Sequence, residues 1–364
     1  MNITSYNITD VAYHYVGLRA LASDGQAGSR RDQLEVIRRG VLKYVEDRAL
    51  RLMLPEPRGT FESVAPKICQ ELIHFGFARL EKGTYILTIR GREVLSLLTE
   101  RRFRELRRAM MVVHLETYDN LATIVRTHME KGPVWRPIVE TQSFSSHGYL
   151  VKLLEPTFHG EAPDVLEAAG LDLSATTAKG MEDALTDLIL RHVFPGQKLR
   201  VGLFRGIVDR LASLRLINLP RAQRDSCEFA KSYSPSVPER HIGELRPWHE
   251  RLSVFLEGRH AYDFFLSDPD MALHSMQETL LQALRESVSG LQPIAGYYDL
   301  PDVRDRVCEM IWIPEAAFDE GVNGLLDRRP SPITVSLQYE RITGRRRPLV
   351  RAGTAQLSNL IRST

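Results

Sequence analysis

The alternation of apolar and polar residues is most regular between residues 60 and 98. Four apolar residues recur there at the spacing of one helix face, which predicts a helix with a buried stripe. These residues are Val64, Ile68, Leu72 and Phe75. The opposite face of the same helix is expected to meet solvent. It carries Ser63, Lys67, Gln70 and Glu71.

Two short runs rich in apolar residues, 77–80 and 85–89, follow this helix. They flank the tetrapeptide Glu81-Lys82-Gly83-Thr84, in which Gly83 can adopt the positive φ of a tight hairpin turn. We therefore expect two antiparallel strands. Gly91 is expected to begin another helix.

The stretch ELIHFGFARLEKGTYILTIRGREVLSLL, residues 71–98, resembles the winged-helix DNA-binding family. In that family the helix before the first strand enters the major groove, and the hairpin wing contacts the DNA backbone or minor groove. The resemblance thus implies groove contacts for Ser63, Lys67 and Gln70, and wing contacts for Lys82 and Thr84. Many winged helices bind proteins instead, so a protein-binding role stays open.

The predicted winged-helix domain spans residues 31–100 and follows an N-terminal segment, 1–30. Residues 31–54 read as its first helix. Residues 91–131 contain almost no helix breaker, so we expect one long helix there, or two helices in line. In the predicted division into domains, residues 101–135 form a long-helix segment of their own. Its apolar positions suit either intrachain packing or a homodimer seam. They are Phe103, Leu106, Met110, Val113, Thr117, Leu121 and Ile124.

The middle of the chain, 136–290, is predicted to be mainly helical, including 248–289. Residues 183–219 suggest a degenerate helix-turn-helix. Five apolar residues of its second helix are expected inside, namely Phe204, Ile207, Val208, Leu211 and Leu214. Arg205, Asp209 and Arg210 are expected outside.

The C-terminal segment, 291–364, predicts a second winged helix. Its helices are expected at 302–311 and 314–327, and its strands at 333–339 and 347–351. The fold class that follows is mainly α with small β-hairpin wings, in a multi-domain arrangement joined by helical bundle segments.

The net charge of +2 is small, but the arginines are clustered. Residues 90–108 hold seven arginines against three glutamates, and residues 341–364 hold six arginines and no acid. Clustered arginine favours phosphate binding, although a solvated helix face has the same composition. Candidate DNA contacts from these clusters are Arg90, Arg92, Arg341, Arg345, Arg346, Arg347 and Arg351.

No nucleotide-binding, hydrolase or metalloprotease motif occurs in the chain, so we expect no catalytic residue, metal or cofactor. The remaining candidates are a Ser145-Ser146-His147 run, three histidines and one acidic group that would hold Mg²⁺ in a nuclease. The histidines are His241, His249 and His260, and the acidic group is Glu257, Asp263, Asp268 and Asp270. Three separated cysteines are expected to be buried thiols, namely Cys69, Cys227 and Cys308.

No apolar run approaches the ~18–20 residues that span a bilayer, so the expected location is the cytoplasm and no membrane partner is expected. The leading hypothesis is a non-enzymatic DNA-binding protein. It would be a bacterial regulator or a subunit of a multi-protein system for chromosome organisation, mobile-element control or phage defence. The alternatives are a scaffold whose winged helices bind partner proteins, and a nuclease with an acidic metal site.

Overall fold

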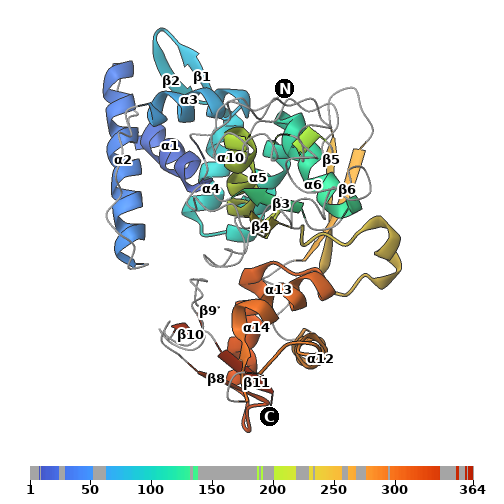
Figure 1. Cartoon of the computed structure of the whole chain (residues 1–364). Helices are drawn as coiled ribbons and strands as arrows, with labels where there is room; N and C mark the ends of the chain where they lie inside the picture. Colours follow the sequence, from blue (N-terminus) through green and yellow to red (C-terminus); the bar gives the residue numbers. More distant parts are fainter. Residues whose placement is uncertain are drawn as a thin grey trace, which may run out of the picture. The chain divides into compact units, whose positions relative to one another are not determined.

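The computed structural model is mainly helical, with small pairs of antiparallel strands (Figure 1). The residues that it describes are 8, 10–23, 29–51, 63–131, 134–137, 187, 190–191, 201–218, 229–232, 234–255, 261–267, 276–293, 296–336, 350–351, 357–358 and 360–363. The chain divides into two compact units. The N-terminal unit comprises Met1–Leu121, Asp209–Leu214 and Val254–Ala261, and the C-terminal unit comprises the remaining residues.

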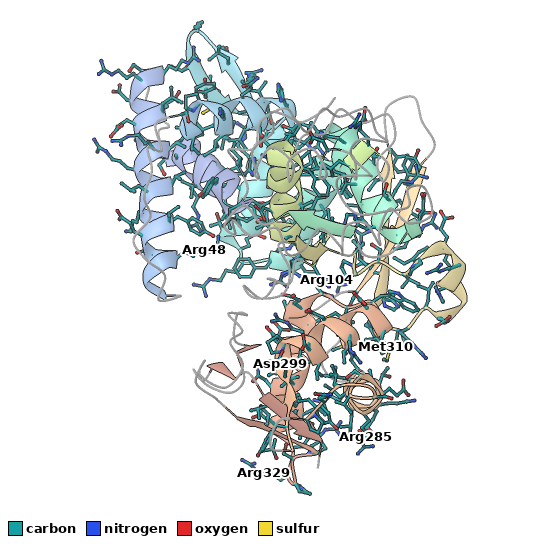
Figure 2. All side chains as sticks on the ribbon, in the orientation of Figure 1. Arg48, Arg104, Arg285, Asp299, Met310 and Arg329 are labelled. Carbon is teal, nitrogen blue, oxygen red and sulfur yellow. The ribbon has the colours of Figure 1, made fainter. Side chains whose placement is uncertain are left out.

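The N-terminal unit packs helices around a two-stranded hairpin. Its elements are α1 (Ala12–Ser23), α2 (Arg30–Arg51), α3 (Val64–His74), β1 (Ala78–Glu81), β2 (Thr84–Leu87), α4 (Ile89–Thr99) and α5 (Phe103–Thr117). The predicted apolar stripe of α3 is confirmed, since all four of its residues are buried. α2 lies along α1 and α3, and Arg48 near its C-terminal end, labelled in Figure 2, pairs with Asp10.

The segment 91–131, predicted as one long helix or two in line, forms three helices, α4, α5 and α6 (Asp119–Lys131). The break before α5 lies at Arg101, whose φ of 59° no α-helix accommodates. Most of the predicted seam is buried within the chain, whereas Phe103 is 53% exposed. Ile89, predicted in a strand, instead opens α4 after the cap residue Thr88.

α10 (Val201–Ser213) coincides with a predicted helix, and its five expected apolar residues are buried. The prediction that Arg210 lies outside is wrong, because this side chain is almost completely buried. The preceding predicted helix, 183–193, falls mostly outside the described residues. β3 (Val134–Pro137) pairs antiparallel with β4 (Phe229–Ser232).

The helix predicted over 248–289 is wrong in its first half. That half forms the paired strands β5 (His249–Phe255) and β6 (Ala261–Ser267), preceded by a short 3₁₀ helix, η2 (Glu239–Glu244). Among the described residues of this range, α12 (Gln277–Ser287) is helical as expected. Along β5 the buried residues alternate, with Leu252 and Val254 inward, and such alternation is the pattern of a strand.

The C-terminal unit ends in two helices and a three-stranded sheet. α13 (Leu300–Ile311) is capped by the Asp299 carboxylate, which accepts from the Asp302 N–H, and it ends at Trp312 in the left-handed conformation. α14 (Glu315–Leu326) follows after Pro314. Apolar side chains from α12, α13 and α14 form one core with Ile333 and Ile361 of the sheet.

The strand pairing in this sheet differs from the prediction. The strand order is β7 (Tyr298–Asp299), β11 (Leu360–Ser363), β8 (Ile333–Ser336), all antiparallel. β8 was expected to pair with 347–351, but its partner is β11, and β9 (Val350–Arg351) pairs with β10 (Leu357–Ser358). The predicted turn, 342–345, lies outside the described residues. No described helix is long and apolar enough to cross a membrane.

Candidate nucleic-acid interface

The solvent face of α3, with its N-cap Ser63, carries three of the side chains predicted to contact DNA. Ser63 and Gln70 are exposed, and Lys67 is half-buried. The helix is held from behind by residues such as Ile68 and Leu72, which have no exposed surface. The three polar residues therefore lie on one face of a helix that is fixed by its opposite side.

The β1–β2 hairpin packs beside α3 (Figure 1). Its turn residues Lys82 and Gly83 have φ of 48° and 82°, which is the pair of positive values found in a type I′ turn. Lys82 is exposed at the tip, while Thr84 donates a hydrogen bond from its hydroxyl to the Glu81 carbonyl at 3.0 Å. Arg79 is a cation on this hairpin that the sequence analysis missed, and it forms an ion pair with Glu81 at 2.9 Å.

The free edge of β2 is held by a side chain from α2. The Gln33 amide donates to the Tyr85 carbonyl at 3.0 Å and accepts from the Tyr85 N–H at 2.9 Å. Gln33 is only 5% exposed, so this pair of bonds is sheltered from water. The bonds occupy backbone groups that another strand would otherwise take, and they fix the hairpin to the helices.

The junction between the hairpin and α4 permits no side chain at Gly91. A Cβ built there would lie 2.0 Å from the Phe77 carbonyl oxygen. The Thr88 hydroxyl accepts from the Gly91 N–H at 3.1 Å and lies 2.6 Å from the Gly76 carbonyl, to which it donates. The hairpin and α4 are thus joined at van der Waals contact of their backbones.

Arg90 and Arg92, both predicted to contact DNA, are exposed but hold backbone carbonyls. Arg90 donates to the Phe75 carbonyl at 3.3 Å, and Arg92 donates to the Leu87 carbonyl at 3.0 Å. The guanidinium of Arg90 also lies over the ring of Phe77, 5.6 Å from its centroid. Both guanidinium groups carry positive charge at the surface, but each already donates a hydrogen bond to a backbone carbonyl of the same unit.

Glu71, predicted on the solvent face of α3, is instead buried in an ionic network. Arg210 donates to its two carboxylate oxygens at 2.9 and 3.0 Å, and His14 Nε2 donates at 2.7 Å. Arg210 also donates to the Ile8 carbonyl at 2.7 Å, and its guanidinium lies 5.9 Å from the ring centroid of Tyr118. α3 is therefore anchored by charge as well as by apolar packing.

The network sets the ionisation of this carboxyl. Burial raises the pKa of Glu71, but the hydrogen bonds and charges of His14 and Arg210 outweigh burial and hold the pKa at about 2. Beside them, burial lowers the pKa of His114 well below its usual value, so this imidazole is neutral. His114 packs against Phe75 in a tilted arrangement, with ring centroids 4.5 Å apart.

Most of the arginines predicted at the C-terminal wing, namely Arg341 and Arg345 to Arg347, lie outside the described residues. Arg351 is described only as part of β9. In the same unit, α14 holds no basic residue. Glu320 and, just after the end of the helix, Asp327 are exposed, whereas Glu315 and Asp319 are partly buried beside Arg304.

The weak candidates for other chemistry are not assembled into a site in the described part of the chain. Asp263 accepts from Arg251 at 2.6 Å and from Ser253 at 2.8 Å, and these bonds lower its pKa. The other members of its predicted acidic group, Glu257, Asp268 and Asp270, lie outside the described residues. So do His260 and the Ser145–His147 run. His241 is hydrogen-bonded to Glu244, and burial lowers the pKa of His249 to about 4.

Among the described residues, no group of three or more His, Cys, Asp or Glu side chains is placed to hold a metal ion. The prediction of buried thiols is confirmed for Cys69 and Cys308, and burial raises both pKa values. Cys227 lies outside the described residues. No known protein family, curated protein or solved structure shows significant similarity to this chain.

Proposed function

We propose that this protein binds duplex DNA through its N-terminal unit, as a winged-helix regulator or subunit of a DNA-associated system. The observation that carries the proposal is one continuous arrangement. A rigidly held helix, α3, presents Lys67 and Gln70 on its solvent face beside a hairpin whose tip is Lys82. A helix of this kind can enter the major groove and contact base edges, and a basic hairpin tip can contact the backbone phosphates.

The rigidity of α3 supports this role. Base reading requires side chains to be held in register with the groove, and supporting residues with locked rotamers provide this. Glu71, on the inward face of α3, is clamped by Arg210 and His14. The hairpin is clamped separately through Gln33. Both proposed contact elements are therefore fixed before DNA arrives.

The test is duplex binding by fluorescence anisotropy, with a 30-base-pair duplex of mixed sequence at 50 and 200 mM salt. Replacing Lys67→Glu together with Lys82→Glu should weaken binding by about tenfold or more and reduce its salt dependence, because fewer counterions are released. A matched control, Arg240→Glu with Arg246→Glu, changes the net charge equally at exposed residues of the C-terminal unit. Equal losses of duplex affinity in both double variants would show that only net charge matters, and would refute the proposed interface.

Gln70→Ala tests base reading separately. We expect it to lower the preference between duplex sequences more than the average affinity, because an amide side chain reads base edges and carries no charge. A uniform loss on all sequences would contradict a groove position for α3.

The C-terminal unit favours a second function, binding to a partner protein. Its order of two helices followed by antiparallel strands supports the proposal of a second winged helix, but α14 is acidic where a groove-reading helix would be neutral or basic. Arg304, buried behind α14, pairs at 3.6 Å with Glu315 and with Asp319 and leaves Glu320 and Asp327 on the exposed side.

We therefore expect Glu320→Lys with Asp327→Lys to change duplex affinity by less than about threefold, an electrostatic effect alone. A change in duplex affinity well beyond threefold, above all a large gain, would mean that α14 contacts DNA. The same anisotropy assay measures it.

A further inference from the structure

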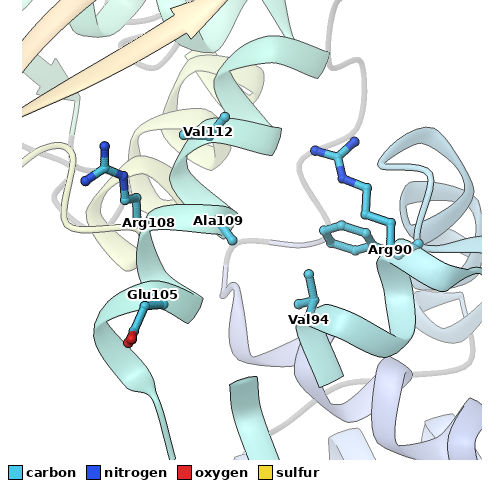
Figure 3. Close-up of a pocket in the computed structure, with 7 residues that line it drawn as sticks. Arg90, Val94, Glu105, Arg108, Ala109 and Val112 are labelled. Atoms are coloured by element: carbon cyan, nitrogen blue, oxygen red, sulfur yellow. The ribbon is translucent and has the colours of Figure 1, made fainter. Parts of the chain in front are cut away.

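A groove between α4 and α5 is separate from the proposed DNA-contacting residues of α3 and the hairpin. It encloses about 290 Å³ and is lined by Phe77, Val94, Ala109 and Val112, with Arg90, Glu105 and Arg108 around them. Figure 3 shows Arg90 on α4 and Arg108 on α5 at opposite sides, with Val94 and Ala109 between them. All of these residues belong to the N-terminal unit.

The floor of the groove is apolar. Phe77 and Val94 are buried, and Ala109 and Val112 are half-buried. A ligand that covered Ala109 and Val112 would remove their remaining apolar surface from water. Two large apolar side chains are also exposed at the first residues of the same helices, Ile89 at 71% and Phe103 at 53%. Contacts to DNA phosphates are polar and need no apolar floor, so the groove is not suited to the DNA backbone.

The charge around the groove is positive. Glu105 is the only acid among the lining residues, and Arg102 donates to it at 3.2 Å. Arg90 is held in place because it donates to the Phe75 carbonyl and lies over the Phe77 ring. A ligand with a carboxylate on either side of an apolar centre is complementary to this arrangement.

We infer that this groove binds an acidic amphipathic helix of a partner protein. A volume of about 290 Å³ accommodates one or two bulky apolar side chains rather than a whole drug-sized ligand. Side chains at positions i and i+4 of a helix enter such a groove together. Glutamates beside them on the partner helix then meet Arg90 and Arg108. The inference does not depend on DNA binding by α3.

The experiment uses the full chain and three fluorescent synthetic peptides. The first has a leucine stripe at helical spacing flanked by glutamates, the second has the same composition with the stripe scrambled, and the third carries lysine in place of glutamate. Anisotropy should show binding of the first peptide with a Kd below about 1 mM, and clear preference over the other two.

Two variants test the groove itself. Arg90→Glu with Arg108→Glu should raise the Kd of the first peptide at least tenfold. Ala109→Arg adds positive charge but fills the floor, so it should also raise the Kd. The control, Arg240→Glu with Arg246→Glu, should leave the Kd within about twofold, and circular dichroism with thermal melting verifies folding of each variant.

Four results would overturn the inference. These are no binding of the first peptide, equal binding of the scrambled peptide, tighter binding by Ala109→Arg, and loss of duplex DNA binding but not of peptide binding in Arg90→Glu with Arg108→Glu. Tighter binding by Ala109→Arg would identify plain charge attraction. The last result would assign the two arginines to the DNA surface.

Discussion

Replacing Arg210 by methionine removes the cation that neutralises Glu71 inside the N-terminal unit. Arg210 is 1% exposed and Glu71 is 7% exposed, so little water reaches the carboxylate in its place. Methionine keeps much of the side-chain length, and the change therefore tests the charge more than the packing. Two carboxylate hydrogen bonds and one bond to the Ile8 carbonyl are lost together.

The magnitude follows from the carboxyl pKa. Glu71 titrates at about 2 in the folded chain against an ordinary value of 4.5, and a shift of that size corresponds to roughly 3 kcal/mol. Because the folded pKa is the lower one, this stability is present above pH 4.5 and is lost as the pH falls toward 2. Removing one partner of a buried ion pair costs about 3–5 kcal/mol. We expect a loss in that range at pH 7.

The readout must be specific to the N-terminal unit. All three tryptophans, Trp135, Trp248 and Trp312, belong to the C-terminal unit, so tryptophan fluorescence reports only that unit. Amide hydrogen exchange of α3, followed by mass spectrometry, gives the opening free energy of the helix. Exchange should be faster by about two to four orders of magnitude in Arg210→Met at pH 7, with little change in tryptophan fluorescence.

Two controls bound the result. Arg39→Met breaks an ion pair with Glu35 in which the arginine side chain is 74% exposed, so it should cost less than about 1 kcal/mol. Adding Glu71→Gln to Arg210→Met removes the buried charge and should recover part of the loss. The deficit of Arg210→Met relative to the parent should also shrink between pH 7 and pH 4. A deficit below about 1 kcal/mol, or one independent of pH, would refute the reasoning.

Three further predictions concern separate parts of the chain. Gly91→Ala should destabilise the N-terminal unit by more than about 2 kcal/mol in the same exchange assay, since its Cβ would overlap the Phe77 carbonyl, and an unchanged rate would contradict the backbone contact. Gln33→Ala should cost about 1–3 kcal/mol by leaving two backbone groups of Tyr85 unsatisfied, with faster exchange confined to the hairpin. Burial raises the pKa of Asp319 to about 7 from 3.8, so stability of the C-terminal unit should fall as pH rises from 4 to 7; Asp319→Asn should flatten that fall in urea titrations followed by tryptophan fluorescence.

Several features of the fold depend on contacts between distant segments, and the local sequence pattern does not predict them. Glu71 and Arg210 stand 139 positions apart, and each was predicted on a solvent face because charged residues are usually exposed. Their burial depends on each other, and no local spacing encodes that pair. For the same reason β8 pairs with β11 and not with the nearer segment at 347–351.

What the sequence by itself determined is local. The buried stripe of α3, the positive-φ turn at Gly83, the buried residues of α10 and the presence of α13 and α14 follow from helical period and turn chemistry, which act over a few residues. Tertiary structure alone decided where α4 ends and α5 begins, which strands pair, and that α3 is clamped by a charge from α10. It also formed the groove between α4 and α5. These features depend on burial and pairing free energies shared by distant segments, which a pattern read along one segment does not contain.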